Sequence, residues 1–367
     1  MRTIYTSCLM TIAALALATS CGKSDTPTAA SGPVDVRLVV SSGNNTRVGS
    51  DKTDNDIRQL RVYAFKADGK KVGYAEADNL KGQNYIPITL SEGGDINFYV
   101  IANDNFGPRP TVDTTSVTDW TSLSKANLES LKFDLSEFGG WSATDDFVSP
   151  MSNNRYDEFG NELKNDSGTA AYKNDYGTAV NVTKPTVILV TVQHVLGRLR
   201  LMLNKESDDV TITLKRAAVY NRPDYFLLYN SGSADIEYEK NESLVDEFVV
   251  SDIPLGTTQK EVARTYLAPN LYGSSDPNTY TAQKTDGTTS NGLNKAYCLK
   301  LTVEFAYTTG TSEKKNYTED YTVYLPRVPR NTSIDVQGTF KGTVVKPEFN
   351  VMTEAWEEKV MNIPEFQ

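Results

Sequence analysis

The sequence predicts an all-β chain folded into β-sandwich domains. Its apolar residues recur in short runs, and segments rich in Gly, Asn, Asp and Pro separate these runs. The chain holds 20 Tyr against 13 Phe, and Tyr, together with abundant Thr and Val, favours strands over helices. Its 367 residues are enough for two domains with separate cores.

Residues 1–20 form a signal peptide. Arg2 supplies its positive end, and Cys8–Ala18 is an apolar run too short to anchor the chain stably in a bilayer. The run leads through small residues into Cys21, as in the lipobox of bacterial lipoproteins, which this segment resembles. Ala18 stands where Leu is usual, with Leu17 one position earlier. We expect Cys21 to carry the lipid; the alternative is an ordinary secretory signal.

Residues 21–47 form a pro-segment with a separable strand. A tether of small polar residues, 22–32, precedes a strand in which one apolar set alternates with the residues between: Val34, Val36, Leu38 and Val40. A polar loop then ends at Arg47. One cut between Arg47 and Val48 would therefore sever a core strand from the folded body.

The N-terminal β-sandwich domain is expected at residues 48–184. Ile57–Phe65 and Lys71–Ala75 read as a hairpin, because Asp68-Gly69 between them is a turn signal. Tyr85–Leu90 and Ile96–Ala102 are further strands, and Ser122–Phe133 has the spacing of a short helix. Residues 152–181 lack periodicity and are expected to form a long surface loop.

The C-terminal β-sandwich domain is expected at residues 185–345, because near Lys184 the sequence changes from a stretch without periodicity to apolar, strand-like runs. It opens with the most apolar run of the mature chain, Thr186–Asn204, whose second half suits either a helix or a strand bulged at Gly197; strand is preferred. The other expected strands are Val210–Leu214, Ala217–Tyr220, Tyr225–Tyr229, Leu244–Val250, Thr265–Ala268, Tyr297–Tyr307, Tyr317–Leu325 and Ser333–Phe340.

No active site or metal site is expected, and no cofactor. His194 is the only histidine and Cys298 the only cysteine outside residues 1–21, which excludes multi-His zinc sites and His-dependent triads. The neighbouring acidic pairs (Asp145-Asp146, Asp208-Asp209, Glu357-Glu358) suit a solvated surface. Asp51, Asp54 and Asp56 lack the Gly and Glu of a calcium loop. A net charge of -10 argues against nucleic-acid binding.

Taken in order, the motifs of this chain resemble the fimbrillin superfamily of Bacteroidia, the subunits of type V pili. The motifs are Cys21, Val34–Val40, Arg47, Ile57–Phe65 with Asp68-Gly69, Val148–Ser152, His194–Leu199, Pro329–Thr332 and the run around Trp356. The resemblance implies two tandem transthyretin-like β-sandwich domains. It also implies export as an outer-membrane lipoprotein, cleavage after Arg47 by a trypsin-like Arg-specific protease, and polymerisation by strand exchange.

The C-terminal tail, residues 346–367, is the candidate donor strand for a neighbouring subunit. Its apolar positions include Phe349, Val351, Trp356, Val360 and Ile363. Removal of Val34–Val40 would leave an apolar groove that only a strand of similar character can fill. The alternative is that the tail is a final strand of its own domain.

These observations favour a non-enzymatic subunit of a cell-surface fimbrium. The expected partners are other pilus subunits, the outer membrane before cleavage, the protease, and a host or bacterial surface receptor. Two alternatives stay open. One is a monomeric surface lipoprotein that binds glycan through Tyr156, Phe159 and Tyr172; the other is an anchor subunit that never polymerises.

Overall fold

A computed structural model describes residues 32–41, 57–78, 80, 85–104, 110–112, 115–134, 149–154, 178–223, 225–229, 245–270, 296–308, 314–341 and 349–355. Strands make up nearly all the regular structure of this part of the chain; the helices are the α-helix α1 (Lys125–Glu129) and the 3-10 helix η1 (Trp120–Ser122). The predicted all-β class is confirmed.

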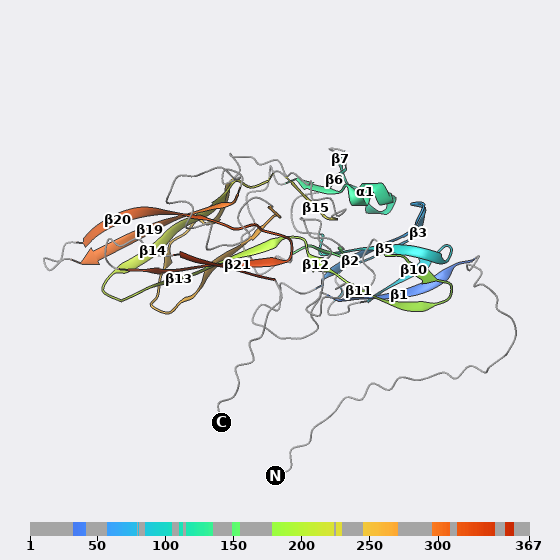
Figure 1. Ribbon diagram of the computed structural model, residues 1–367, viewed down its shortest axis with the longest axis horizontal. Helices are drawn as coiled ribbons and strands as arrows, with labels where there is room; N and C mark the ends of the chain where they lie inside the picture. Colours follow the sequence, from blue (N-terminus) through green and yellow to red (C-terminus); the bar gives the residue numbers. More distant parts are fainter. Residues whose placement is uncertain are drawn as a thin grey trace, which may run out of the picture.

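The N-terminal lobe contains two sheets that share one core (Figure 1). The three-stranded sheet has the order β11 (Thr186–Thr191), β1 (Val34–Ser41), β4 (Tyr85–Leu90). The six-stranded sheet has the order β12 (Gln193–His194), β9 (Met151–Ser152), β5 (Gly94–Ala102), β2 (Gln59–Lys66), β3 (Lys71–Asp78), with β10 (Val180–Val182) also on β5. The predicted hairpin is present as β2–β3, where Gly69 adopts a φ of 84° that favours glycine.

The C-terminal lobe repeats this arrangement. A four-stranded sheet has the order β18 (Lys260–Leu267), β13 (Gly197–Lys205), β21 (Thr332–Phe340), β22 (Phe349–Ala355). A five-stranded sheet has the order β16 (Val245–Val249), β14 (Thr211–Tyr220), β19 (Cys298–Thr308), β20 (Lys314–Tyr324), with β17 (Ile253–Pro254) on β14. Side chains from both sheets form a single core between them.

A smaller sheet and α1 cover the other face of the β2–β5 region. The sheet has the order β15 (Tyr225–Leu227), β8 (Lys132–Asp134), β6 (Pro110–Val112), β7 (Thr115–Ser116). An aromatic-rich core joins these elements to β2 and β5, with Tyr63, Phe65 and Tyr99 facing Phe133 and Phe226. Only the centre of the predicted helix Ser122–Phe133 is helical, because Ser124 caps it and the chain turns back into β8 after Ser130.

The change from one core to the other comes later than the sequence suggested. β11 follows Lys184, yet its Ile188 and Val190 lie in the N-terminal core, as does Val192. The first core residue of the C-terminal pair of sheets after these is Leu199, on β13. The division expected after Lys184 is therefore corrected to the segment between Val192 and Gly197, and the strand preferred for the second half of the apolar run is present as β13.

Three sequence motifs far apart in the chain meet where the two lobes join. The Val195 N–H donates to Pro150 O at 3.0 Å, and the Asn331 N–H donates to Leu196 O at 3.1 Å. Arg330 Nη1 and Ser152 Oγ both donate to Leu228 O, at 3.2 and 2.9 Å. Ser152 and Arg330 are buried, so the lobes share hydrogen bonds that water cannot replace without opening the junction.

Gly197 gives a test of this junction. A Cβ at this position would lie 2.5 Å from Val328 Cγ1, whereas a Cβ at Gly256 would meet nothing within 4 Å. Gly197→Ala should lower the free energy of unfolding by about 1–3 kcal/mol, as overpacking does, when measured by urea denaturation. The matched control Gly256→Ala should change it by less than about 0.5 kcal/mol; equal effects would contradict the close approach.

Candidate strand-exchange site

β1 occupies the central position of its sheet. It pairs in parallel with β11 from Val36↔Thr186 to Ser41↔Thr191, and antiparallel with β4 from Val34↔Leu90 to Val39↔Tyr85. Both edges of β1 are thus hydrogen-bonded along most of its length. A strand in this position cannot leave without separating β11 from β4.

The inward face of β1 is part of the N-terminal core. Val34, Val36, Leu38 and Val40 are each at most 3% exposed. They contact the core to which Ile86, Ile88, Ile188 and Val190 also belong. Burial of four such side chains contributes about 6–12 kcal/mol at 1.5–3 kcal/mol each, an upper bound because denatured chains already bury some surface. That is comparable with the whole net stability of a domain, about 5–15 kcal/mol.

The sequence places only fifteen residues, 42–56, between β1 and the described start of the body at Ile57, and these hold the expected cleavage position. Arg47 and Val48 lie outside the described residues, as does the lipid-attachment candidate Cys21. Their assignment stays a prediction from the sequence.

The first part of the C-terminal tail is an edge strand of its own lobe. β22 pairs antiparallel with β21 from Gly338↔Phe349 to Thr332↔Ala355. Val351 is 2% exposed, and the Phe349 ring lies 6.0 Å from that of Phe340 and 5.9 Å from that of Tyr321. Trp356, Val360 and Ile363 lie outside the described residues. β22 borders one strand, so its departure would break one ladder.

Of the residues considered for chemistry, His194 and Cys298 lie in the described part of the chain, and each is buried. His194 is 3% exposed, and burial followed by the charge of Arg198 lowers its pKa to about 3, so it is neutral. Cys298 is buried and begins β19. Within the described residues, no three His, Cys, Asp or Glu side chains come together as metal ligands. Tyr156, Phe159, Tyr172, the aspartates near Asp51, and the pairs at Asp145 and Glu357 lie outside those residues.

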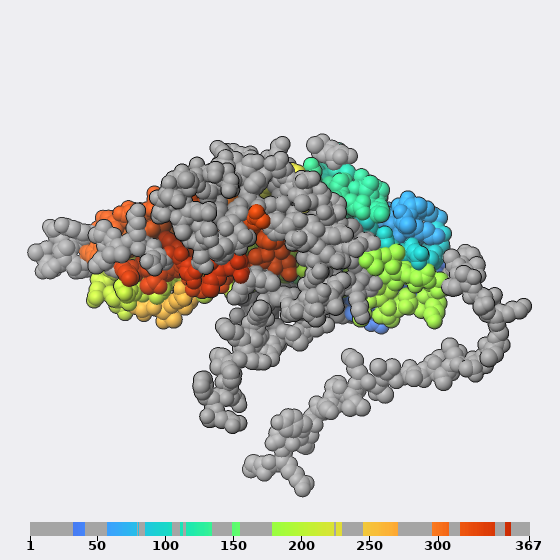
Figure 2. Space-filling model, in the orientation of Figure 1, coloured from blue at the N-terminus to red at the C-terminus, as the bar shows by residue number. Residues whose placement is uncertain are grey.

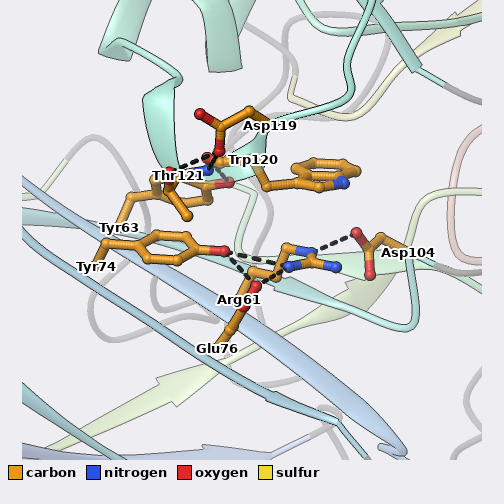
Figure 3. Close-up of polar contacts among 8 residues, drawn as sticks. All are labelled: Arg61, Tyr63, Tyr74, Glu76, Asp104, Asp119, Trp120 and Thr121. Atoms are coloured by element: carbon orange, nitrogen blue, oxygen red, sulfur yellow. Dashed lines mark hydrogen bonds and ion pairs between the residues drawn. The ribbon is translucent and has the colours of Figure 1, made fainter.

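A polar cluster around Arg61 was not foreseen from the sequence (Figure 3). Arg61 Nε donates to Asp104 Oδ2 at 2.6 Å and Nη1 to the Tyr74 hydroxyl at 3.2 Å, and the guanidinium forms an ion pair with Glu76. It also stacks 4.9 Å from the Trp120 ring. Burial raises the pKa of Asp104, and the Arg61 hydrogen bond and charge oppose that rise.

This cluster is structural. The Tyr63 hydroxyl donates to Trp120 O at 2.9 Å, so the same patch ties η1 to the face of β2. The strand pattern predicts that Arg61 and Tyr63 share a face, but their partners come from positions 43 and 57 residues away, which local patterns do not specify.

Comparison with known proteins finds a family model that matches the N-terminal part of the chain. Residues 33–193 match the family model of the major fimbrial subunit protein (FimA). This match begins at β1 and ends with β12, so it covers the strands of the two N-terminal sheets. The resemblance to fimbrillins is confirmed.

Solved structures show that the fimbrillin likeness extends to the fold of the remaining chain. A candidate cell adhesion protein from Bacteroides eggerthii is 13% identical with a TM-score of 0.51, over 90% of this chain and 98% of its own. The tip fimbrial protein Mfa3 from Porphyromonas gingivalis, truncated at its C-terminus, is 14% identical with a TM-score of 0.50, over 88% and 100%. No curated protein matches the sequence.

The fimbrillin match supports a pilus or adhesive subunit at the cell surface and points to a structural rather than an enzymatic role. Among the described helices, none has the length and apolar character needed to cross a membrane.

The contribution of β1 can be measured with one substitution and its surface counterpart. Leu38→Ala removes a fully buried side chain and should lower the free energy of unfolding by about 2–5 kcal/mol. Leu189→Ala makes the same chemical change on the neighbouring strand at a side chain that is 61% exposed, and should cost under about 1 kcal/mol. Urea denaturation of the uncleaved precursor distinguishes them; similar losses would mean that β1 is not packed into the core.

A buried ion pair in the C-terminal lobe makes stability depend on pH. Asp246 is 0% exposed and forms an ion pair with Arg222; burial raises its pKa from 3.8 to about 6, against the lowering effect of that charge. At a pH between these two pKa values, Asp246 is protonated in the folded chain and ionised in the unfolded chain. The free energy of unfolding should therefore fall as pH rises from about 4 to about 6, by roughly 3 kcal/mol from this group.

Asp246→Asn should remove that part of the pH dependence. The difference in unfolding free energy between wild type and variant, measured by urea denaturation at intervals from pH 4 to pH 7, should change across the acid range and level off above it. A difference that is constant with pH would contradict the raised pKa of Asp246.

Proposed function

We propose that this protein is a subunit of a type V pilus that is exported as a lipoprotein and polymerises by β-strand exchange. Cys21 carries the lipid, cleavage between Arg47 and Val48 releases β1, and the tail of another subunit fills the vacated groove. The observation that carries this proposal is the position of β1. It is the central strand of its sheet and its apolar side chains are buried, yet in the sequence it precedes the expected cleavage position at Arg47.

The energetics favour replacement over an empty groove. Loss of β1 exposes the apolar surface that four side chains covered, and it leaves β11 and β4 without the strand to which each was paired. Both penalties are relieved when another extended segment adds to the two strands. An intact precursor is protected from this exchange because its own β1 already fills the site.

The tail is the donor in this proposal. β22 is an edge strand that pairs with β21, so its departure breaks one ladder. Pro347 and Pro364 limit continuous pairing to the stretch between them, which holds Phe349, Val351, Trp356, Val360 and Ile363. The aromatic contacts of Phe349 are lost on departure, and burial in the neighbour's groove offsets them.

A second candidate role is a subunit that receives a strand but donates none. It is favoured by the packing of Phe349 and Val351 into their own lobe. Such a subunit would end a fibre rather than extend it. A monomeric glycan-binding lipoprotein remains the alternative from the sequence, and its candidate aromatic residues lie outside the described residues.

The cleavage step is tested by Arg47→Ala. Fibres collected from cells expressing this variant should be absent, and the lipidated precursor should accumulate, because β1 stays in its own groove. Arg58→Ala, at the next arginine in the sequence, is the control and should leave processing intact. Normal fibres and a shortened surface form in Arg47→Ala would place the cleavage site elsewhere.

The donor role is tested by truncation after Lys346. The shortened subunit should remain folded in circular dichroism, since only an edge strand is lost, but it should not enter fibres as a donor. A chain ending at Ala355 keeps β22 and separates the need for that strand from the need for residues 356–367. Unfolding of the first truncation would make β22 an ordinary core strand; normal fibres would make this subunit a recipient only.

A further inference from the structure

The outward side of the β1 sheet carries an exposed surface that strand exchange does not use. We call it the outer face, and it consists of Asp35, Arg37, Val39, Tyr85, Pro87, Thr89, Val187 and Leu189. The strand register sets its rows: Tyr85, Val39 and Leu189 lie side by side, and Pro87, Arg37 and Val187 form the next row. Figure 2 shows that the segment containing β10 and β11, in yellow-green at the right, lies at the molecular surface.

The outer face carries two of the exposed large hydrophobic side chains of the described residues. Val187 is 59% exposed and Leu189 is 61% exposed, and with Val250 they are the exposed large hydrophobic residues of the described chain. Val187 and Leu189 lie two residues apart on one strand, so both project from the same side of the sheet. Paired exposed aliphatic side chains in the same rows as Tyr85 and Pro87, which lie across β1, are typical of a contact surface rather than of scattered surface residues.

The charges of the outer face are balanced. Asp35 and Arg37 are its only ionisable side chains apart from the Tyr85 hydroxyl, and they lie two residues apart on β1. Asp35 Oδ1 accepts a hydrogen bond from Thr89 Oγ1 at 2.8 Å, and the Arg37 guanidinium stacks 3.8 Å from the Tyr85 ring. Both charges are therefore held in place on a chain whose overall charge is -10.

We propose that the outer face binds the outer face of a second copy of this chain. A two-fold axis between the copies lets Asp35 of each meet Arg37 of the other, so the contact is self-complementary. Elsewhere, the net negative charge makes two copies repel, whereas this face is locally neutral and apolar. Sheets commonly pack face to face, and the outward side of this three-stranded sheet can pack in that way.

The contact differs from strand exchange in geometry and in timing. A two-fold contact closes after two copies, whereas strand exchange links copies head to tail without closing. Self-association of the precursor does not depend on the proposed function. The loss of self-association on cleavage does rest on the proposed function, because Asp35, Arg37 and Val39 leave with β1. The dimer contact would then exist in the precursor and be absent from the fibre.

A charge-swap experiment tests the proposal directly. Asp35→Arg gives an all-positive pair at positions 35 and 37, and Arg37→Asp gives an all-negative pair. Sedimentation velocity of the full-length precursor, carrying Cys21→Ser to prevent lipidation, should show concentration-dependent dimers in the parent protein. Each charge variant alone should dimerise at least about tenfold more weakly, and an equimolar mixture of the two should recover the association.

Substitutions in β11 supply the matched control. Val187→Lys and Leu189→Lys should weaken dimerisation, whereas Val250→Lys, at an exposed aliphatic residue outside the outer face, should not. A monomeric parent at all concentrations, a mixture no better than its components, or equal losses at Val250 would overturn the proposal. So would binding of the precursor to phosphatidylethanolamine–phosphatidylglycerol vesicles that depends on Val187 while self-association does not, because the occupant would then be a membrane.

Failure of this test is separable from failure of strand exchange. Dimers of the uncleaved precursor form with Arg47 intact or mutated, whereas fibres require cleavage. Cleaved protein that forms fibres but never dimerised as a precursor would overturn only the outer-face proposal.

Discussion

The structure depends on one strand, β1, that lies between two strands which are not paired with each other. β4 and β11 are joined through β1, and the core behind them is closed by its inward side chains. The first sheet of the chain is therefore completed by a strand that fifteen residues separate from the described start of the body. Any event that removes them opens a long apolar groove with unpaired backbone on both sides, and this is the physical basis of the proposed assembly.

Each lobe has a central strand with one parallel and one antiparallel neighbour, but the two strands are connected to the chain differently. In the N-terminal lobe β1 lies between an antiparallel and a parallel neighbour, and in the C-terminal lobe β13 has the same pair of relations, to β18 and β21. β13 is connected at both ends to neighbouring strands, β12 and β14, so one cut in the chain cannot release it. β22 is an addition outside β21, bordered on one side. The fold thus has one central strand that a cut can release and one edge strand that can detach.

The sequence predicted these elements well where a local pattern determines them. The alternation from Val34 to Val40 specifies a strand with one buried face, and Asp68-Gly69 specifies a hairpin, because side-chain period and turn chemistry act over a few residues. The position of the lobe boundary was missed because Thr186–Thr191 is apolar whichever core it joins. Only its parallel pairing with β1, about 150 residues earlier, decides this. The Arg61 cluster and the buried junction at Leu228 depend likewise on groups brought together by the topology.

The central claim is that β1 must leave its sheet before subunits can join, and a reversible lock on that strand tests it most directly. Arg37 and Val187 are partners in the parallel register and both project outward, so Arg37→Cys with Val187→Cys should form a disulfide between β1 and β11 without entering the core. The measurement is fibre formation, by electron microscopy, from locked subunits that have been cleaved after Arg47. The account predicts no fibres until a reductant is added and fibres afterwards. Fibres from the oxidised, cleaved protein would contradict it.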